Sequence, residues 1–180
     1  MEKKIYIVRH CEAQGQSKEA NLTEKGFDQA IYVANFFSNI KLDRIIASPF
    51  LRAIQSIEPL TKQAKIELET DDRLSERILS KTELPDWLEK LKATFSDMDL
   101  SFVGGESSNE AMGRAVNIVE DILKGNAENT LIVTHGNLMS LLIKKYRSDF
   151  GFDCWLKLSN PDIYLLRLKN NQSTIQRIWK

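Results

Sequence analysis

The stretch that decides the fold is Lys4-Ile5-Tyr6-Ile7-Val8-Arg9-His10-Cys11-Glu12, close to the start of the chain. Residues 4–8 form a short apolar run rich in β-branched side chains, which predicts a buried strand. The run ends abruptly at Arg9-His10, which predicts a loop directly after the strand. Ligands of α/β proteins bind beyond the carboxyl ends of the strands. His10 is therefore the first candidate for a functional residue.

The same pattern recurs further along the chain. Thr130–Thr134 (TLIVT) is the clearest buried strand, and it is followed at once by His135, the second of only two histidines. Both histidines are thus predicted at strand ends. Other stretches also predict strands: residues 43–48, a weaker one at 66–70, and residues 163–168 and 174–179 on either side of an Asn-Asn turn.

Helical patterns fill the intervals between these strands. Thr23 is predicted as the N-cap of a helix, and Ser107 with Glu110 has the spacing of a capping box. Pro49 is predicted in the first turn of the helix after the second strand, and further helical patterns cover residues 81–100 and 138–143. The core-facing stripe of the first helix is predicted to hold Phe27, Ala30, Ile31, Ala34 and Phe37. Strands alternating with helices predict an α/β fold around a mostly parallel sheet.

Composition and charge set the broad class. The 180 residues are 42% apolar and 28% charged, and 25 basic residues balance 25 acidic ones. This predicts a soluble protein of one domain, residues 1–180, without a charge that would attract nucleic acid or an anionic membrane. No signal peptide or membrane-spanning run is visible, so a cytoplasmic location is expected. Two cysteines, Cys11 and Cys154, are too few for a secreted disulfide framework.

Four short motifs carry polar residues with no role in a core. They are Arg9-His10-Cys11-Glu12, Ser48-Pro49-Phe50-Leu51-Arg52-Ala53, Leu74-Ser75-Glu76-Arg77 and Thr134-His135-Gly136-Asn137. In this order, and at these places relative to the strands, they resemble the signature of the histidine phosphatase superfamily, also called the phosphoglycerate mutase-like superfamily. The resemblance implies a three-layer α/β/α sandwich of the phosphoglycerate mutase-like type.

The resemblance also implies a catalytic set. His10 would take up the phosphoryl group, Arg9 and Arg52 would bind phosphate oxygens, His135 would stabilise the transition state, and Glu76 would act as general acid and then as general base. The chemistry is consistent, because arginine forks suit phosphate oxygens. Two nearby cations are also expected to lower the pKa of His10 and keep it nucleophilic near pH 7.

The predicted substrate-binding residues are Gln16, Arg77, Gly136 and Asn137. Gln16 stands where relatives often carry a phosphate-contacting asparagine, and the alternative is a solvated loop residue. Arg77 either contacts substrate or forms an exposed ion pair, which would contribute little. Two histidines on separate strands without a paired spacing do not suggest a metal centre. No metal and no cofactor are therefore expected.

Three other positions near these motifs have alternative interpretations. Cys11 stands where the superfamily usually has glycine, and it is either a small tolerated side chain or an oxidisable thiol. Glu12 is expected to orient a neighbouring arginine or histidine rather than touch substrate. Ser107 is expected to be a helix cap first, with a ligand role as the alternative.

The predicted function is hydrolysis of phosphomonoesters through a covalent phosphohistidine. One alternative is a cofactor-primed phosphoglycerate mutase; another is a non-catalytic relative that binds a phosphorylated ligand. Residues 77–105 are predicted to form a lid, in which Trp87, Leu88 and Phe102 either present apolar surface to the substrate or pack the lid onto the body. The expected partner is a small phosphorylated molecule or a phosphoprotein, with no nucleic acid and no membrane, and the oligomeric state is open.

Overall fold

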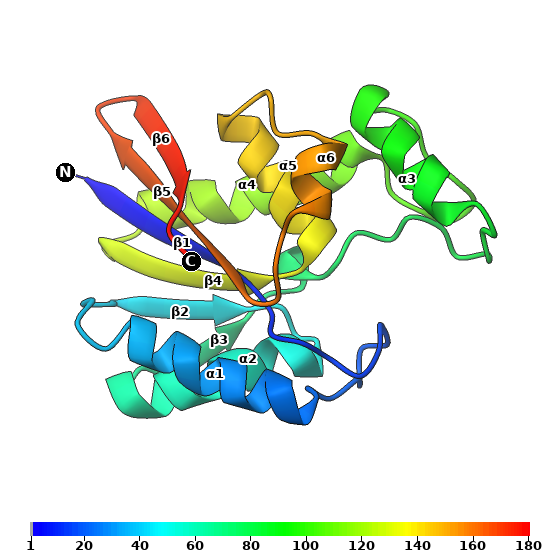
Figure 1. Cartoon of the computed structure of the whole chain (residues 1–180). Helices are drawn as coiled ribbons and strands as arrows, with labels where there is room; N and C mark the ends of the chain where they lie inside the picture. Colours follow the sequence, from blue (N-terminus) through cyan, green and yellow to red (C-terminus); the bar gives the residue numbers. More distant parts are fainter. Residues whose placement is uncertain (1) are drawn as a thin grey trace.

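Six strands form one sheet in the order β3-β2-β4-β1-β5-β6 in the computed structural model, which describes residues 2–180 (Figure 1). Strands β1 to β4 pair in parallel, whereas β5 is antiparallel to β1 and β6 is antiparallel to β5. The strands are β1 (Lys3–Arg9), β2 (Arg44–Ala47), β3 (Leu68–Thr70), β4 (Asn129–Thr134), β5 (Asp162–Lys169) and β6 (Gln172–Arg177). The predicted α/β fold with a mostly parallel sheet is confirmed.

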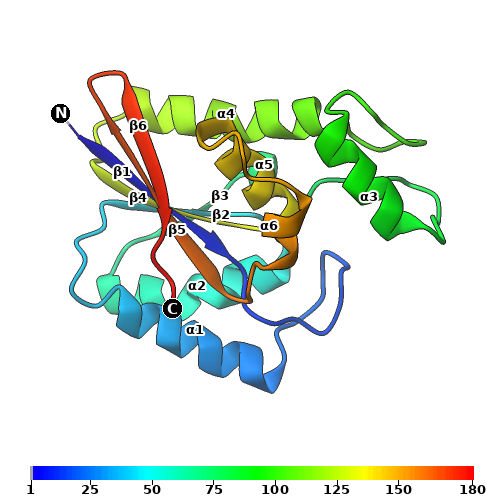
Figure 2. The same ribbon diagram turned by 45° about the horizontal axis from the view of Figure 1, so that its top comes forward.

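Helices cover both faces of this sheet, as Figures 1 and 2 show: α1 and α2 lie on one face, and α4 and α5 lie on the other. The predicted three-layer sandwich is therefore confirmed. The helices are α1 (Glu24–Phe36), α2 (Leu51–Ala64), α3 (Trp87–Ser96), α4 (Ser108–Lys124), α5 (Gly136–Tyr146) and α6 (Phe152–Leu156), with a 3-10 turn η1 (Asp72–Leu74). No helix within residues 2–180 has the length and apolar character needed to cross a membrane.

The central strand β1 is buried on both faces, which explains its uninterrupted apolar run. Successive side chains of a strand point to opposite faces. Ile5 and Ile7 accordingly join the core beneath α4 and α5, while Tyr6 and Val8 join the core beneath α1 and α2. Two cores on one sheet fix β1 and its neighbour β4 rigidly, and with them the residues that follow each strand.

Both predicted helix caps are confirmed. The Thr23 side chain accepts a hydrogen bond from the N–H of Gly26 at 3.0 Å. Ser107 and Glu110 form the reciprocal capping box at the start of α4. These short-range contacts stabilise the first turns of the two helices, each by about 1 kcal/mol.

The core-facing stripe of α1 was predicted incorrectly at Phe27 and Ile31, which are 47% and 52% exposed. The buried side instead runs through Gly26, Ala30, Val33 and Ala34, followed by Phe37. The cause is a close approach: a Cβ atom at position 26 would collide with the backbone carbonyl oxygen of Glu12. Glycine at this position lets the helix lie against the loop after β1, and the contact sets which face turns inward.

Two other local predictions also need correction. Pro49 precedes its helix, because α2 begins at Leu51 with Phe50 as its N-cap. The helix predicted over residues 81–100 is shorter, because α3 spans only Trp87–Ser96. Pro85 disfavours helical geometry in the residue before it, and Lys81 instead donates its N–H to the carbonyl of Val103 at 2.9 Å.

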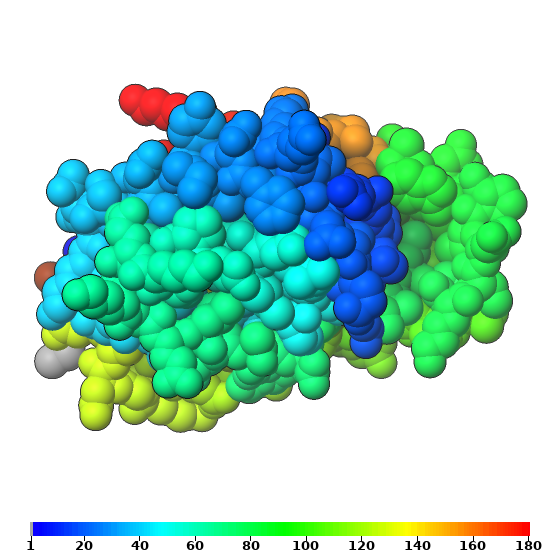
Figure 3. All heavy atoms as spheres, turned by 90° about the horizontal axis from the view of Figure 1, so that it is seen from below, coloured from blue at the N-terminus to red at the C-terminus, as the bar shows by residue number. Residues whose placement is uncertain are grey.

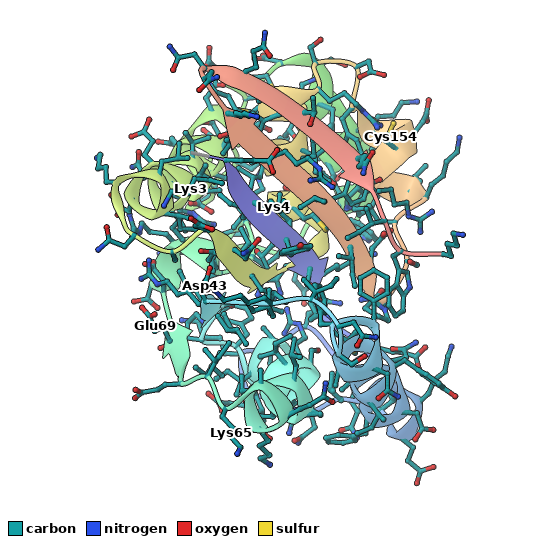
Figure 4. The ribbon with its side chains drawn as sticks, turned by 90° about the vertical axis from the view of Figure 1, so that its left-hand side faces the viewer. Lys3, Lys4, Asp43, Lys65, Glu69 and Cys154 are labelled. Carbon is teal, nitrogen blue, oxygen red and sulfur yellow. The ribbon has the colours of Figure 1, made fainter. Side chains whose placement is uncertain are left out.

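The amino ends of the strands are held by contacts of their own, at the end of the sheet that faces the viewer in Figure 4. Lys3 donates from Nζ to the carbonyls of Gly125 and Ala127 at 2.7 and 2.6 Å. Asp43 accepts from the backbone N–H groups of Glu128 and Asn129 at 3.1 and 2.9 Å. The polar groups at the amino ends of the strands are thus used in hydrogen bonds that hold the fold. The candidate functional residues lie at the opposite, carboxyl ends of the strands.

Candidate active site

The two histidines meet because β1 and β4 are parallel neighbours that end in register. Arg9 lies opposite Thr134, and the N–H of His10 donates to the carbonyl of Thr134 at 3.0 Å. The centres of the His10 and His135 rings are 5.1 Å apart. Sheet topology thus brings together two residues that are 125 positions apart in the chain.

The hydrogen bonds of His10 define its tautomer. Nδ1 lies 2.7 Å from the carbonyl oxygen of Cys11, and since a carbonyl only accepts, Nδ1 must carry the proton. Arg52 donates from Nε to Nε2 of His10 at 3.2 Å, so Nε2 carries the lone pair. The imidazole is held neutral, with Nε2 as its unprotonated nitrogen.

Burial is the main reason why His10 is neutral. It lowers the pKa of His10 to about 3, with smaller contributions from Arg52 and Arg9, while the hydrogen bond to Cys11 opposes the shift. The sequence correctly predicted a lowered pKa, but it assigned the effect to the two arginines alone. Packing of the ring into the protein, which removes water from the charged form, has the larger effect.

Arg52 connects the parts of the site from the first turn of α2. Its side chain is fully buried, and Nη1 donates to the carbonyls of Gln16 and Ser17 at 3.1 and 2.7 Å. Nη2 lies 3.2 Å from Nδ1 of His135. One guanidinium therefore contacts both histidines and the loop after β1.

His135 is also neutral in this structure. Arginine has no acceptor atom, so Nδ1 of His135 accepts from Arg52 and Nε2–H donates to Ser48 Oγ at 2.7 Å. Burial, then His10 and Arg52, lower the pKa of His135 well below its usual value. The His135 ring of the free site is thus uncharged. A bound phosphate dianion would favour protonation.

Arg9 presents an unused donor. Its Nη1 donates to the carbonyl of Leu158 at 3.0 Å, but Nε is buried and has no hydrogen-bond partner in the described part of the chain. Gly136 makes room for this group, because a Cβ there would lie 3.0 Å from the guanidinium. A buried cationic donor without an acceptor is costly unless an anion completes it.

Glu76 is fixed at the amino end of α5. One carboxyl oxygen accepts from the N–H groups of Arg77 and Leu138 at 2.8 and 2.9 Å, and the other accepts from the N–H of Asn137 at 3.0 Å. The side-chain amide of Asn137 is buried, and neither its nitrogen nor its oxygen has a partner among residues 2–180. Asn137 thus offers an open donor and acceptor beside the carboxyl group.

A cavity of about 370 Å³ opens beside these groups. The predicted residues Arg9, Glu76, Gln16, Arg77, Gly136 and Asn137 line it, together with Leu79, Trp87, Leu91 and Trp155. His10, Arg52 and His135 are buried next to the cavity rather than in its lining. Figure 3 shows a hollow between the loop after β1, in dark blue, and the segment around α3, in green.

Comparison with known families agrees with this geometry. The model of the histidine phosphatase superfamily (branch 1) matches residues 5–179. The chain belongs to this superfamily.

Individual relatives of this histidine phosphatase carry both phosphatase and mutase names. It is 25% identical to "Putative phosphoserine phosphatase 2" of Hydrogenobacter thermophilus, over 96% of this chain and 93% of the relative. It is 27% identical to "Probable phosphoglycerate mutase GpmB" of Shigella dysenteriae, over 88% and 82% of the two chains. Among solved structures, a mycobacterial glucosyl-3-phosphoglycerate phosphatase in complex with inorganic phosphate superposes with a TM-score of 0.77 at 19% identity, covering 97% and 95%.

The guanidinium of Arg77 forms hydrogen bonds within the chain. It is buried, so the exposed ion pair considered from the sequence is wrong. Its guanidinium donates to Thr94 Oγ1 at 2.9 Å and to the carbonyl of Glu106 at 2.9 and 3.2 Å. Arg77 borders the cavity, but its donors join the two ends of the segment 77–105 to α3.

The structure decides the roles of two residues next to His10 in the chain, Glu12 and Cys11. Glu12 does not orient an arginine or histidine as predicted. Its carboxylate instead accepts from Thr23 Oγ1 and Lys25 Nζ at 3.0 and 2.9 Å, at the start of α1. The Cys11 side chain is fully buried and burial raises its pKa to about 11, which supports the small-side-chain interpretation over a reactive thiol.

Asn160 is a positioning residue that the sequence did not reveal. Its side-chain amide donates to the carbonyl of His10 at 2.8 Å from 150 residues away. Trp155 and Leu79, which line the cavity, were also missed. None of the three lies in a motif, and only the folded chain brings them to the site.

Proposed function

We propose that this histidine phosphatase hydrolyses phosphomonoesters through a covalent phosphohistidine at Nε2 of His10. The observation that carries the proposal is the fixed tautomer of His10, whose Nδ1 proton is donated to Cys11 and whose Nε2 lone pair faces Arg52. In the first step Nε2 attacks phosphorus and the P–O bond to the alcohol breaks, while Glu76 gives a proton to the departing oxygen. In the second step water attacks phosphorus, Glu76 takes its proton, and the P–N bond breaks.

The other polar groups suit the charge of this transition state. Arg52 is already placed beside Nε2, and the unpaired Nε of Arg9 and amide of Asn137 offer donors for phosphoryl oxygens. Such transfer depends mainly on positioning and on neutralising the equatorial oxygens. Because side chains fill each role, we propose that the reaction needs no metal and no cofactor.

We also propose that residues 77–105 form the lid over this site. The two ends of the segment meet, because Glu106 donates its N–H to the carbonyl of Ile78 at 2.8 Å and Arg77 binds the carbonyl of Glu106. The segment packs on the body through Phe95, whose ring centre lies 5.9 Å from that of Phe152. A small phosphorylated molecule fits this arrangement as substrate.

The mutase name of one relative keeps phosphoglycerate mutase as the second candidate. Two features favour hydrolysis. The loop between Gln16 and Leu22 is short, and the residues after the acid read Arg77-Ile78-Leu79-Ser80, whereas the glycolytic mutases that the motifs resemble have longer or aromatic segments there. A mutase must shield its phosphohistidine from water, and short flanking segments provide little material for that closure.

The test is hydrolysis of 4-nitrophenyl phosphate in the presence of EDTA and without added metal. We expect phosphate release at a rate that EDTA leaves unchanged. In parallel, conversion of 3-phosphoglycerate to 2-phosphoglycerate is measured with catalytic 2,3-bisphosphoglycerate. Activity that EDTA removes and Mg²⁺ or Zn²⁺ restores would contradict metal independence, and interconversion far faster than phosphate release would favour the mutase.

The effect of Glu76→Gln is expected to depend on the leaving group. Glutamine keeps the size of the side chain but cannot give up a proton, and acid catalysis matters most when the departing oxygen is basic. We expect kcat/KM to fall by about 10²- to 10⁴-fold for an alkyl phosphate and much less for 4-nitrophenyl phosphate. Equal losses on the two esters would show that Glu76 only supports the site.

A further inference from the structure

The cavity beside the phosphate site has an apolar side. Leu79 precedes α3, Trp87 and Leu91 belong to α3, and Trp155 belongs to α6. Leu91 is 6% exposed and packs α3 onto the body, but Trp87 is 51% exposed. An indole that lines a cavity and is half exposed leaves apolar surface for a ligand to cover.

Both cations in the cavity lining are already engaged, Arg77 with neutral protein oxygens and Arg9 in the role proposed for the phosphoryl group. Arg9, Glu76 and Arg77 are the charged members of the lining. All three nitrogens of the Arg77 guanidinium donate to protein oxygens, those of Thr94, Ser108 and Glu106. The open donor of Arg9, the residue before His10, is assigned to the phosphoryl group. Glu76 is never cationic, so it offers no attraction to a carboxylate on the substrate.

We infer that the preferred substrates are phosphate monoesters of uncharged alcohols that carry an apolar, flat group, which lies against Trp87 and Trp155. The inference rests on the proposed function, because it specifies the alcohol released in that reaction. A cavity of about 370 Å³ has room for a phenyl ring on a short linker. Esters whose alcohol carries a carboxylate, such as phosphoserine or phosphoglycerate, are expected to be poor substrates.

The test compares three esters of primary alcohols, so that the departing oxygen has similar basicity: 3-phenylpropyl phosphate, propyl phosphate and the phosphate monoester of 4-hydroxybutanoate. We expect kcat/KM for the phenylpropyl ester to exceed that for the propyl ester by about tenfold or more, because the carbons of its phenyl ring leave water when they contact the cavity wall. The carboxylate ester is expected to fall below the propyl ester.

Trp87→Ala and Leu88→Ala separate the role of the indole from a general effect on α3. Leu88 is the next residue, is 43% exposed, and does not line the cavity. Trp87→Ala is expected to reduce the phenylpropyl-to-propyl ratio of kcat/KM severalfold. Leu88→Ala is expected to leave this ratio unchanged.

Each outcome bears on one proposal. The inference alone is overturned by any of three results: a kcat/KM for the carboxylate ester equal to that for the phenylpropyl ester, equal kcat/KM for the phenylpropyl and propyl esters, or an unchanged phenylpropyl-to-propyl ratio in Trp87→Ala. Failure to release phosphate from any ester contradicts the proposed function instead. In that case titration of the intrinsic tryptophan fluorescence with 3-phenylpropylphosphonate and propylphosphonate still tests the inference, and equal affinities overturn it.

Discussion

Replacing His10 with asparagine is expected to lower kcat for 4-nitrophenyl phosphate by about 10⁴- to 10⁶-fold, the usual result of losing a covalent nucleophile. Asparagine keeps a side-chain N–H that can donate to the carbonyl of Cys11, as Nδ1 does at 2.7 Å, but it has no counterpart of Nε2. The substitution therefore removes the nucleophilic atom while preserving the nearest buried hydrogen bond. The thermal midpoint of unfolding, measured in parallel, shows whether the variant stays folded.

The nucleophile is also identified directly by trapping. Wild-type protein mixed with substrate and quenched without acid should carry a phosphoryl group that is stable in base and labile in acid, as a phosphoramidate is. We expect peptide mapping to place it on His10 and to find none in His10→Asn. An adduct on His135 or on a carboxylate would show that the nucleophile has been assigned to the wrong residue.

Local sequence patterns predicted those features of the fold that depend on neighbouring residues. The run at residues 5–8 is apolar throughout because β1 is buried on both faces. Thr23 and the Ser107–Glu110 pair form caps by contacts within one helical turn. The alternation of strands and helices predicted parallel pairing, but only the structure shows that β4 is the neighbour of β1, the pairing that brings the two histidines together.

Features that depend on contacts between residues far apart in the chain could not be predicted from local sequence patterns. The inward face of α1 is set by the contact of Gly26 with the backbone of Glu12, so periodicity misplaced Phe27 and Ile31. Burial, which is the main cause of the low pKa of His10, is a property of the assembled site. Asn160 reaches His10 only because β1 and β5 are neighbours in the sheet.

Arg52→Lys is expected to lower kcat by about 10³-fold although the positive charge is kept. The guanidinium of Arg52 reaches four acceptors at once: Nε2 of His10, the carbonyls of Gln16 and Ser17, and Nδ1 of His135. A lysine ammonium is a compact point charge with a single nitrogen and cannot span them. Loss of the fork leaves the two histidines without their shared donor and the phosphoryl oxygens without a planar partner.

Two controls distinguish a loss of transition-state stabilisation in Arg52→Lys from a loss of structure. One is inhibition by orthovanadate, and the other is a matched variant. Vanadate mimics the transition state, so its inhibition constant should rise in Arg52→Lys as kcat falls. Arg44→Lys is the control, because Arg44 also forms a fork, to Glu69 at 2.8 and 2.7 Å, but at the partly exposed amino end of β2. An exposed pair of this kind contributes little, so kcat should stay within about twofold of wild type. Equal losses in the two variants, or a fully active Arg52→Lys, would mean that the Arg52 fork does not organise the site.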